Sequence, residues 1–162
     1  GKFVDQDKPG AGIFFDGRLA ENFKLLSGTW VNVGALRMVL IENGKPLIRD
    51  VVLAGEGRNN VAALIFLNDT ACLAHLRDNG HDVGDSHDIF SCMHIRAAMD
   101  DILKQHNVDN RASSRRIAFY RIQSEEPSIS QNEITEKGYI NQRAVLKRRA
   151  REVAFAYGED EA

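Results

Sequence analysis

Two apolar runs limit the folds open to this chain more strongly than any other feature. Residues 47–54 and 61–67 are rich in Val, Ile, Leu and Phe, and a polar segment with two glycines separates them. β-Branched and aromatic side chains favour strands, and glycine favours the turn between them. The pattern therefore predicts two neighbouring strands in the interior of a sheet.

The rest of the chain shows helical periodicity and short strand patterns. Leu36, Val39 and Leu40 recur at i, i+3 and i+4, and Asn43 with Gly44 follows as a helix stop. The predicted elements are, in chain order, a strand at 13–15, a hairpin at 23–33 around a Ser27-Gly28-Thr29 turn, a helix at 34–42, strands at 47–54 and 61–67, helices at 70–77 and 88–106, a strand at 116–122, a polar loop at 124–137 and a closing helix at 140–157.

This order of elements predicts an α+β fold, namely a small, largely antiparallel sheet with an N-terminal β-hairpin and helices packed on it. A length of 162 residues fits one domain. We expect 1–12 to be a linker, 13–157 to be the folded domain and 158–162 to be an acidic tail. The chain begins with Gly and not Met, which we expect for a piece of a longer protein. A processed tag would also leave a Gly at this position.

Composition argues against several classes of protein. The chain is 43% hydrophobic and 27% charged, as ordinary globular chains are. No apolar run approaches the ~20 residues of a membrane span, and no signal peptide opens the chain, so no membrane partner is expected. A net charge of −2 gives no field that would recruit nucleic acid. Cys72 and Cys92 are too few for a disulfide framework, which indicates a reducing, cytoplasmic setting.

Two polar segments contain residues that could carry chemistry. In 16–24, Arg18 follows a glycine and presents a planar guanidinium that suits a phosphate or a sugar hydroxyl. In 134–143, Lys137 stands in a loop before a helix, where an ammonium could neutralise developing negative charge. Taken singly, each segment is more typical of a surface turn with an exposed cation, because short motifs are weak.

Two other clusters are assigned no chemistry. Residues 81–88 gather histidines and aspartates that could bind Zn²⁺ or Mn²⁺. They lack a helical i, i+4 ligand pair, so a polar loop is favoured and no metal ligand is assigned. The basic cluster of Lys147, Arg148, Arg149 and Arg151 has no interleaved aromatic platform for nucleic acid, and we expect it to be a solvated face of the closing helix.

Together and in order, the two polar segments resemble the C-terminal domain of AMP-forming adenylating enzymes. The first reads FDGRLAENFKL at 15–25 and SGTWVNVGALR at 27–37, and the second reads ITEKGYINQRAVL at 134–146. The residues of these segments are most similar to those of feruloyl-CoA synthases, a branch of the acyl-CoA synthetases. The likeness covers about 13–157, and the pair of motifs is far more specific than either one alone.

The resemblance implies a two-step ligase reaction on a small aromatic carboxylic acid, such as ferulate or another hydroxycinnamate. The carboxylate attacks the α-phosphate of ATP to give an acyl-adenylate and pyrophosphate, and the thiol of CoA then displaces AMP. It also implies a larger N-terminal adenylate-forming domain that binds the acid and most of the nucleotide with Mg²⁺. Residues 13–157 would be the mobile C-terminal domain, inactive by itself and retaining no cofactor.

The resemblance also assigns roles residue by residue. Arg18 matches the arginine that contacts the nucleotide near the hinge, and Lys137 matches the adenylation lysine. The hinge falls at Ala20 and Glu21, and the hairpin that lines the CoA tunnel falls at Gly28, Thr29 and Trp30.

This sequence departs from the family pattern at the hinge pair, where Asp or Lys is usual, and at two other places. Residues 33–35 replace the usual Pro-x-Glu, and Lys137 precedes Gly138 where the family places the glycine first. An alignment on the glycine would put Tyr139 at the lysine position. The register therefore stays open between Lys137 and Tyr139, and Lys137 is favoured because only an ammonium carries the charge.

Two other functions remain open from the residues alone. One is a non-catalytic α+β module with a regulatory or interaction role, in which neither Arg18 nor Lys137 would matter to a ligand. The other is a metal-dependent enzyme that uses residues 81–88, which would bind a metal through oxygen and nitrogen ligands.

Overall fold

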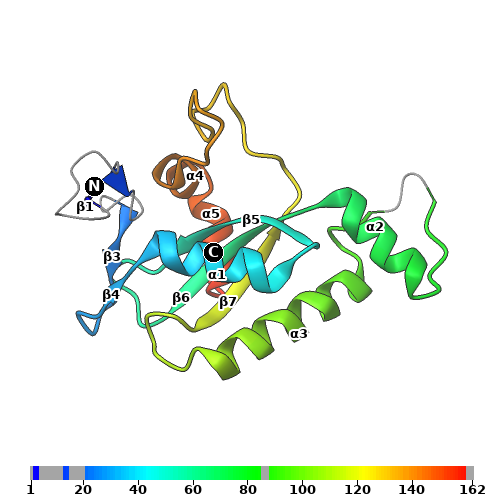
Figure 1. The fold of residues 1–162 in the computed structure, drawn as a ribbon, viewed down its shortest axis with the longest axis horizontal. Coiled ribbons are helices and arrows are strands. Elements are labelled where there is room, and N and C mark those ends of the chain that lie inside the picture. The colour runs from blue at the N-terminus through cyan, green and yellow to red at the C-terminus, as the bar shows by residue number, and fades with distance from the viewer. Residues whose placement is uncertain (1, 4–12, 15–20, 85–87, 160–162) are drawn as a thin grey trace.

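A three-stranded sheet stands between two layers of helices in the computed structural model, which describes residues 2–3, 13–14, 21–84 and 88–159 (Figure 1). The sheet has the order β5 (Ile48–Ala54), β6 (Val61–Leu67) and β7 (Ile117–Gln123). β5 is antiparallel to β6, and β7 is parallel to β6. The predicted α+β class is confirmed, with one parallel pairing in the central sheet.

The central strand β6 is buried along its whole length. Its odd-numbered residues belong to the larger hydrophobic cluster on one face of the sheet, and Leu64 and Phe66 belong to a smaller cluster on the other face. A strand that is covered on both faces has apolar residues at nearly every position. Burial of both faces therefore explains the apolar run at 61–67.

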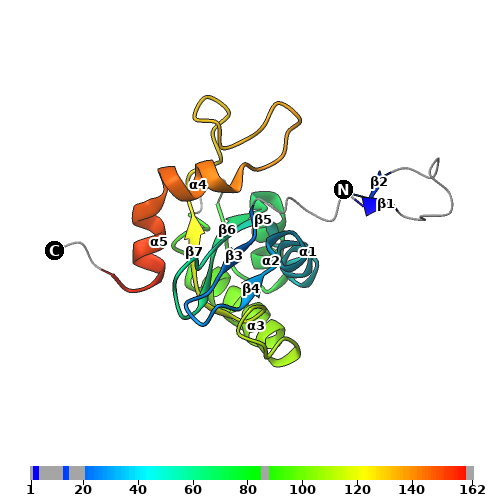
Figure 2. The same ribbon diagram turned by 90° about the vertical axis from the view of Figure 1, so that its left-hand side faces the viewer.

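The two faces of the sheet are covered by different helices (Figure 2). The larger cluster includes side chains of α1 (Val33–Gly44), α2 (Asp69–Asp78) and α3 (Met93–Asp109). The smaller cluster is completed by α4 (Gln142–Arg148) and α5 (Ala150–Ala156). Along the chain, α2 and α3 connect β6 to β7. They form the long crossover connection that two parallel neighbouring strands require.

Asparagine side chains fix the first residues of three helices. Asn32, Asn68 and Asn141 are the N-caps of α1, α2 and α4, and each accepts a hydrogen bond from the amide three residues further on, at 3.0, 3.1 and 3.4 Å. Such caps satisfy amides that have no partner within the helix. The observed starts of α1 and α2 lie within a residue of the predicted ones.

The predicted N-terminal hairpin is confirmed. β3 (Phe23–Lys24) pairs antiparallel with β4 (Trp30–Val31), and Gly28 in the connecting turn has a φ of 86°. Ahead of it, β1 (Lys2–Phe3) pairs antiparallel with β2 (Ile13–Phe14). Most of the expected linker 1–12 and of the tail 158–162 lies outside the described residues.

The closing helix predicted at 140–157 is wrong as a single helix. α4 and α5 meet at Arg149, whose backbone leaves the helical region with φ −103° and ψ 31°. Arg149 was expected to face solvent, but it is 6% exposed. Its guanidinium binds the carboxylate of Glu133, which is also buried. The chain therefore turns where an arginine points inward.

The helix predicted at 88–106 begins later, at Met93, and ends at Asp109. The Asp88 carboxylate accepts hydrogen bonds from the Phe90 amide at 2.9 Å and the Ser91 hydroxyl at 2.5 Å. An aspartate that bonds nearby groups in this way favours a turn over a helix. Within 21–84 and 88–159, no helix is both long and apolar enough to cross a bilayer.

Candidate functional site

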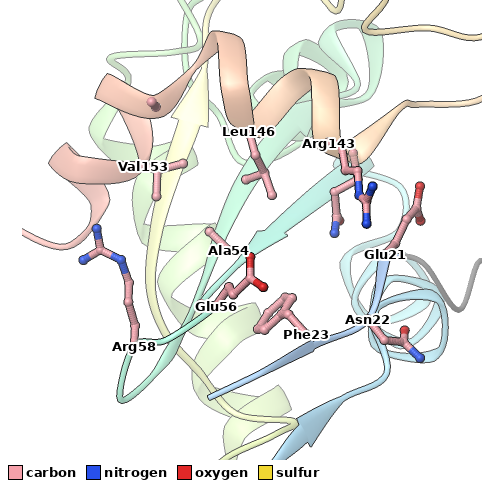
Figure 3. Close-up of a pocket in the computed structure, with 12 residues that line it drawn as sticks. Glu21, Asn22, Phe23, Ala54, Glu56, Arg58, Arg143, Leu146 and Val153 are labelled. Atoms are coloured by element: carbon pink, nitrogen blue, oxygen red, sulfur yellow. The ribbon is translucent and has the colours of Figure 1, made fainter. Parts of the chain in front are cut away.

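The two polar segments that the sequence singled out meet at a hollow of about 300 Å³ between the hairpin, the β5–β6 turn and α4–α5 (Figure 3). The first segment contributes Glu21, Asn22 and Phe23, and the second contributes Gln142, Arg143 and Leu146. The other lining residues are Ala54, Gly55, Glu56, Arg58, Ala150 and Val153. Residues from the two ends of the chain thus form one candidate site.

Two buried contacts fasten these segments to the sheet. The side-chain oxygen of Gln142, which is 2% exposed, accepts a hydrogen bond of 3.0 Å from the backbone amide of Leu53 in β5. On the other side, the ring of Phe23 packs on Gly55, where a Cβ atom would stand 2.9 Å from the ring. The end of β5 is therefore held between the hairpin and the start of α4.

The rim of the hollow carries both signs of charge. Figure 3 shows Glu21 and Arg143 on one side of it and Arg58 on the other. Arg58 donates two hydrogen bonds to Glu159, at 2.5 and 3.1 Å, and lies 4.1 Å from the ring centre of Tyr157. The Glu159 carboxylate raises the pKa of Arg58 against the opposing effect of desolvation. Such a rim can bind a charged ligand or the charged surface of another domain.

Lys137 lies in a tight turn beyond this hollow. The amide of Gly138 donates to the Thr135 carbonyl at 2.8 Å, and the Thr135 amide donates to the Tyr139 carbonyl at 2.8 Å. Gly138 has a φ of 82°, in the left-handed region that favours glycine. A turn followed by a left-handed glycine is a standard hairpin connection. This backbone favours a glycine directly after the lysine, which accounts for the Lys-Gly order.

The base of this turn is a short two-stranded connection. Ile134 and Ile140 form an antiparallel bridge, and the Asn141 amide donates to the Glu133 carbonyl at 2.8 Å. Asn141 also caps α4, so the turn and the helix share a residue. The position of Lys137 is therefore set by residues at the start of α4 and by Glu133.

The structure places both register candidates for the catalytic lysine on the surface. Lys137 is exposed, and it makes no ion pair or hydrogen bond with any residue of the described part of the chain. Tyr139 is 65% exposed. Neither side chain is in the core, and the ammonium of Lys137 remains the only positive charge of the two.

The expected CoA-tunnel residues lie in the turn and second strand of the hairpin. Trp30 is 61% exposed, and the ammonium of Lys24 lies 4.9 Å from its ring centre. The hydroxyl groups of Ser27 and Thr29 are 3.0 Å apart. Trp30 also lines a second hollow of about 360 Å³, together with Asn32, Ala35, Leu36, Val39, Asn110, Ser114 and Arg115. The hairpin thus offers an exposed aromatic ring beside a cation.

Some predicted site residues lie outside the described residues. These are Arg18, the expected nucleotide contact, and Ala20, one half of the expected hinge. Glu21, the other half, lines the first hollow. In 81–88, which is described only in part, His81 stacks on His94 with ring centres 3.7 Å apart. No group of three or more His, Cys, Asp or Glu among the described residues could hold a metal ion.

Sequence reasoning missed the buried polar residues behind the site. Gln142, Glu133 and Arg149 are all nearly inaccessible to solvent. Each residue type is mostly exposed in proteins. Glu133 was assigned to a polar loop and Arg149 to a solvated helix face, and Gln142 was not predicted to be buried. Only the turn in the helix at Arg149 distinguishes this arginine from its neighbours, and the helical pattern of the sequence contains no signal for that turn.

No protein-family model matches the chain, and no curated protein matches it significantly. Solved structures do match. The adenylation (A) domain of a carboxylate reductase from Mycobacterium chelonae superposes with a TM-score of 0.65 at 14% identity, over 88% of this chain and 20% of that one. The A-PCP didomain of a carboxylic acid reductase from Segniliparus rugosus, in complex with AMP, gives 0.63 at 16% identity, over 89% and 18%.

A third structure agrees with these two. The A domain of the Segniliparus rugosus carboxylic acid reductase, in complex with AMP and a co-purified carboxylic acid, gives a TM-score of 0.60 at 17% identity, over 89% of this chain and 21% of that chain. The chain therefore has a fold that occurs in adenylation domains, and it spans about a fifth of the length of these neighbours.

Proposed function

We propose that this chain is the C-terminal domain of an ATP-dependent, AMP-forming ligase that joins an aromatic carboxylic acid to CoA. Its substrate would be a hydroxycinnamate such as ferulate. One observation carries the proposal: the two segments that resemble adenylating enzymes line one hollow in a fold that occurs in adenylation domains. The particular acid and the use of CoA rest on the resemblance of these two segments to the corresponding sequences of feruloyl-CoA synthases.

Lys137 would supply the charge that the first step needs. As the carboxylate oxygen bonds to the α-phosphorus of ATP and pyrophosphate leaves, negative charge develops on the phosphoryl oxygens. An ammonium held at these oxygens in a site without water stabilises the transition state by several kcal/mol, or about 10²–10³ in rate. Exposure on a tight turn suits a lysine that reaches a phosphoryl group bound by another domain.

The hairpin would serve the second step. The thiolate of CoA attacks the acyl carbon of the adenylate, the bond to the phosphate oxygen breaks, and AMP leaves. Gly28, Thr29 and Trp30 would line the path of the pantetheine arm, and Glu21 would belong to the hinge about which the domain rotates. A Mg²⁺ ion that accompanies ATP has no ligand set among the described residues, so no step assigned to this chain passes through a metal.

The proposal is tested with the full-length protein that contains this chain. Pyrophosphate exchange into ATP should depend on ferulate or another hydroxycinnamate, and CoA should then give the corresponding thioester. Lys137→Ala should lower the exchange rate about 10²–10³-fold. Lys147→Ala is the matched control because Lys147 is also exposed and lies on the neighbouring helix α4. Exchange by Lys137→Ala at the rate of the control would contradict the proposal.

The solved neighbours favour a second acceptor for the acyl group. All three belong to carboxylic acid reductases, and one includes a PCP domain. In that case the adenylate would form in the same way and would pass to the thiol of a carrier domain instead of free CoA. Acid-dependent pyrophosphate exchange without thioester formation on added CoA would favour this acceptor over the proposed one.

A further inference from the structure

We infer that the buried ion pair Glu133–Arg149 is the positioning element of the Lys137 turn, so that these two residues act on adenylation through the lysine. This inference rests on the proposed function. Neither residue lines either of the two hollows described above. Lys137 makes no hydrogen bond or ion pair with either of them. Their contribution would be to hold the backbone that carries the ammonium.

Donors surround the carboxylate of Glu133, whose side chain is fully buried. The guanidinium of Arg149 donates to its two oxygens at 2.8 and 3.1 Å. The backbone amide of Ser128 donates at 2.8 Å, and Arg148 donates at 3.1 Å. A buried carboxylate with this many charged and backbone donors has a fixed position.

Arg149 in turn ties this carboxylate to the end of β7 and the segment after it. Its guanidinium donates to the side-chain oxygen of Gln123 at 3.0 Å, and to the backbone carbonyls of Glu125 and Glu126 at 2.8 and 3.0 Å. Among the described residues, no buried side-chain nitrogen or oxygen lacks a hydrogen-bond partner. The arginine therefore joins three separate segments: β7, the loop before the turn and the α4–α5 junction.

The connection from this pair to the lysine is short. Glu133 is the last residue before the bridge between Ile134 and Ile140, and its carbonyl accepts the amide of Asn141 on the returning side of the turn. The pair thus fixes both arms of the turn at the base, four residues from Lys137. A displacement of about 1 Å at a reacting group can cost about 10²-fold in rate, so fixing this base matters for catalysis.

The alternative role for such a pair is stability alone. Removing one partner of a buried ion pair strongly destabilises a protein, because the other charge is left unpaired. A loss of activity in a single variant would therefore not separate the two roles. A double-mutant cycle with Lys137 does separate them, because residues that act as one unit give non-additive losses.

The test uses the full-length protein and acid-dependent pyrophosphate exchange. Glu133→Gln should lower kcat about 10- to 100-fold, with little change in the KM for ATP. In a Lys137→Ala background, the same substitution should have no further effect. Arg37→Gln is the matched control, since the partly buried Arg37–Asp50 pair joins α1 to β5 and shares no partner with Glu133 or Arg149. It should leave kcat unchanged.

Hydrogen exchange measured by mass spectrometry gives a readout that does not depend on activity. In Glu133→Gln, peptides that cover 133–141 should exchange at least about tenfold faster, while peptides from β6 keep the protection of the wild-type protein. Arg149→Lys is the second variant: it keeps a positive charge opposite Glu133 but loses the fork of donors, so the fold should persist while the turn loosens.

The outcomes are distinct. The positioning role would be overturned if the double variant lost kcat by the product of the two single-variant factors, because the two residues would then act independently. Unchanged hydrogen exchange at 133–141 in Glu133→Gln would also overturn it. Lost protection in β6 in both Glu133→Gln and Arg149→Lys would make the pair a determinant of the whole fold and would also overturn it. Full activity of Lys137→Ala would refute the proposed function itself, and the exchange data would still decide whether the pair holds the turn.

Discussion

Tyr157→Phe removes one hydroxyl from the contact that fastens the end of α5 to the sheet. The Tyr157 hydroxyl lies 2.6 Å from the carbonyl oxygen of Asn60 and 3.2 Å from that of Ala54, and it donates to this pair of acceptors. The ring also packs edge-to-face on Phe119, with ring centres 5.4 Å apart, and beneath the guanidinium of Arg58. Phenylalanine keeps both ring contacts, so the substitution isolates the hydroxyl.

The expected loss is about 1–2 kcal/mol in the free energy of unfolding. A hydrogen bond of this kind contributes about 1 kcal/mol, and a partly buried carbonyl left without its donor adds to the cost. For a chain of 162 residues, this lowers Tm by about 2–4 °C per kcal/mol. Urea unfolding should show a lower midpoint with an unchanged slope, because the exposed surface is the same in both proteins.

Tyr139→Phe is the matched control. Tyr139 is 65% exposed, and its hydroxyl makes no hydrogen bond to the residues that the structure describes. Tyr139→Phe should change the free energy of unfolding by no more than about 0.5 kcal/mol. Equal losses in Tyr139→Phe and Tyr157→Phe would refute the reasoning, since they would show that the Tyr157 hydroxyl is no better bonded in the folded protein than in the unfolded chain.

The same hydroxyl also predicts a dependence on pH. Burial raises the pKa of Tyr157 to about 12, although the neighbouring Arg58 guanidinium lowers it. The unfolded value is about 10, so the fold favours the protonated phenol. This contribution to stability is complete below about pH 10 and is lost as the pH rises through 12. The difference in stability between wild type and Tyr157→Phe should therefore narrow over this range.

The parts of the fold that the sequence predicted are those that local chemistry decides. Strand β6 is apolar at every position because both of its faces are covered, and its β-branched and aromatic residues favour a strand. The apolar spacing of Leu36, Val39 and Leu40 predicted α1 to within a residue of its observed start, because helical periodicity is a property of neighbouring residues. The caps at Asn32 and Asn68 are equally local, although the sequence analysis did not use them.

The arrangement of α4 and α5 could not be predicted in this way. A repeat of apolar residues gives the same pattern for one helix or for two that meet at an angle. The difference lies in Arg149, which binds a carboxylate 16 positions earlier in the chain. Arginine and glutamate are mostly exposed in proteins, so a single sequence assigns both to the surface. Only packing against Phe66 and the end of β7 shows that this pair is buried.

The remaining predictions concern packing, thiol reactivity and acid stability. Gly44→Ala should lower the free energy of unfolding by about 1–3 kcal/mol in urea, because the new Cβ would overlap the side chain of Ile48, standing 2.6 Å from its Cγ1 and 2.8 Å from its Cβ. A disulfide reagent at pH 8 should modify Cys92 well before Cys72, since burial raises the pKa of Cys72 to about 11; equal rates would contradict this. Burial alone would raise the pKa of Glu133, but its arginine and amide donors outweigh that effect and hold the pKa below its usual value. Because the folded pKa is the lower one, the stability from this carboxylate is complete above about pH 4.5 and is lost as the pH falls through the folded value. Unfolding in urea at pH 6 and pH 3.5 should therefore show a steeper acid loss for wild type than for Glu133→Gln, and parallel losses would mean that the carboxylate is not held by its donors.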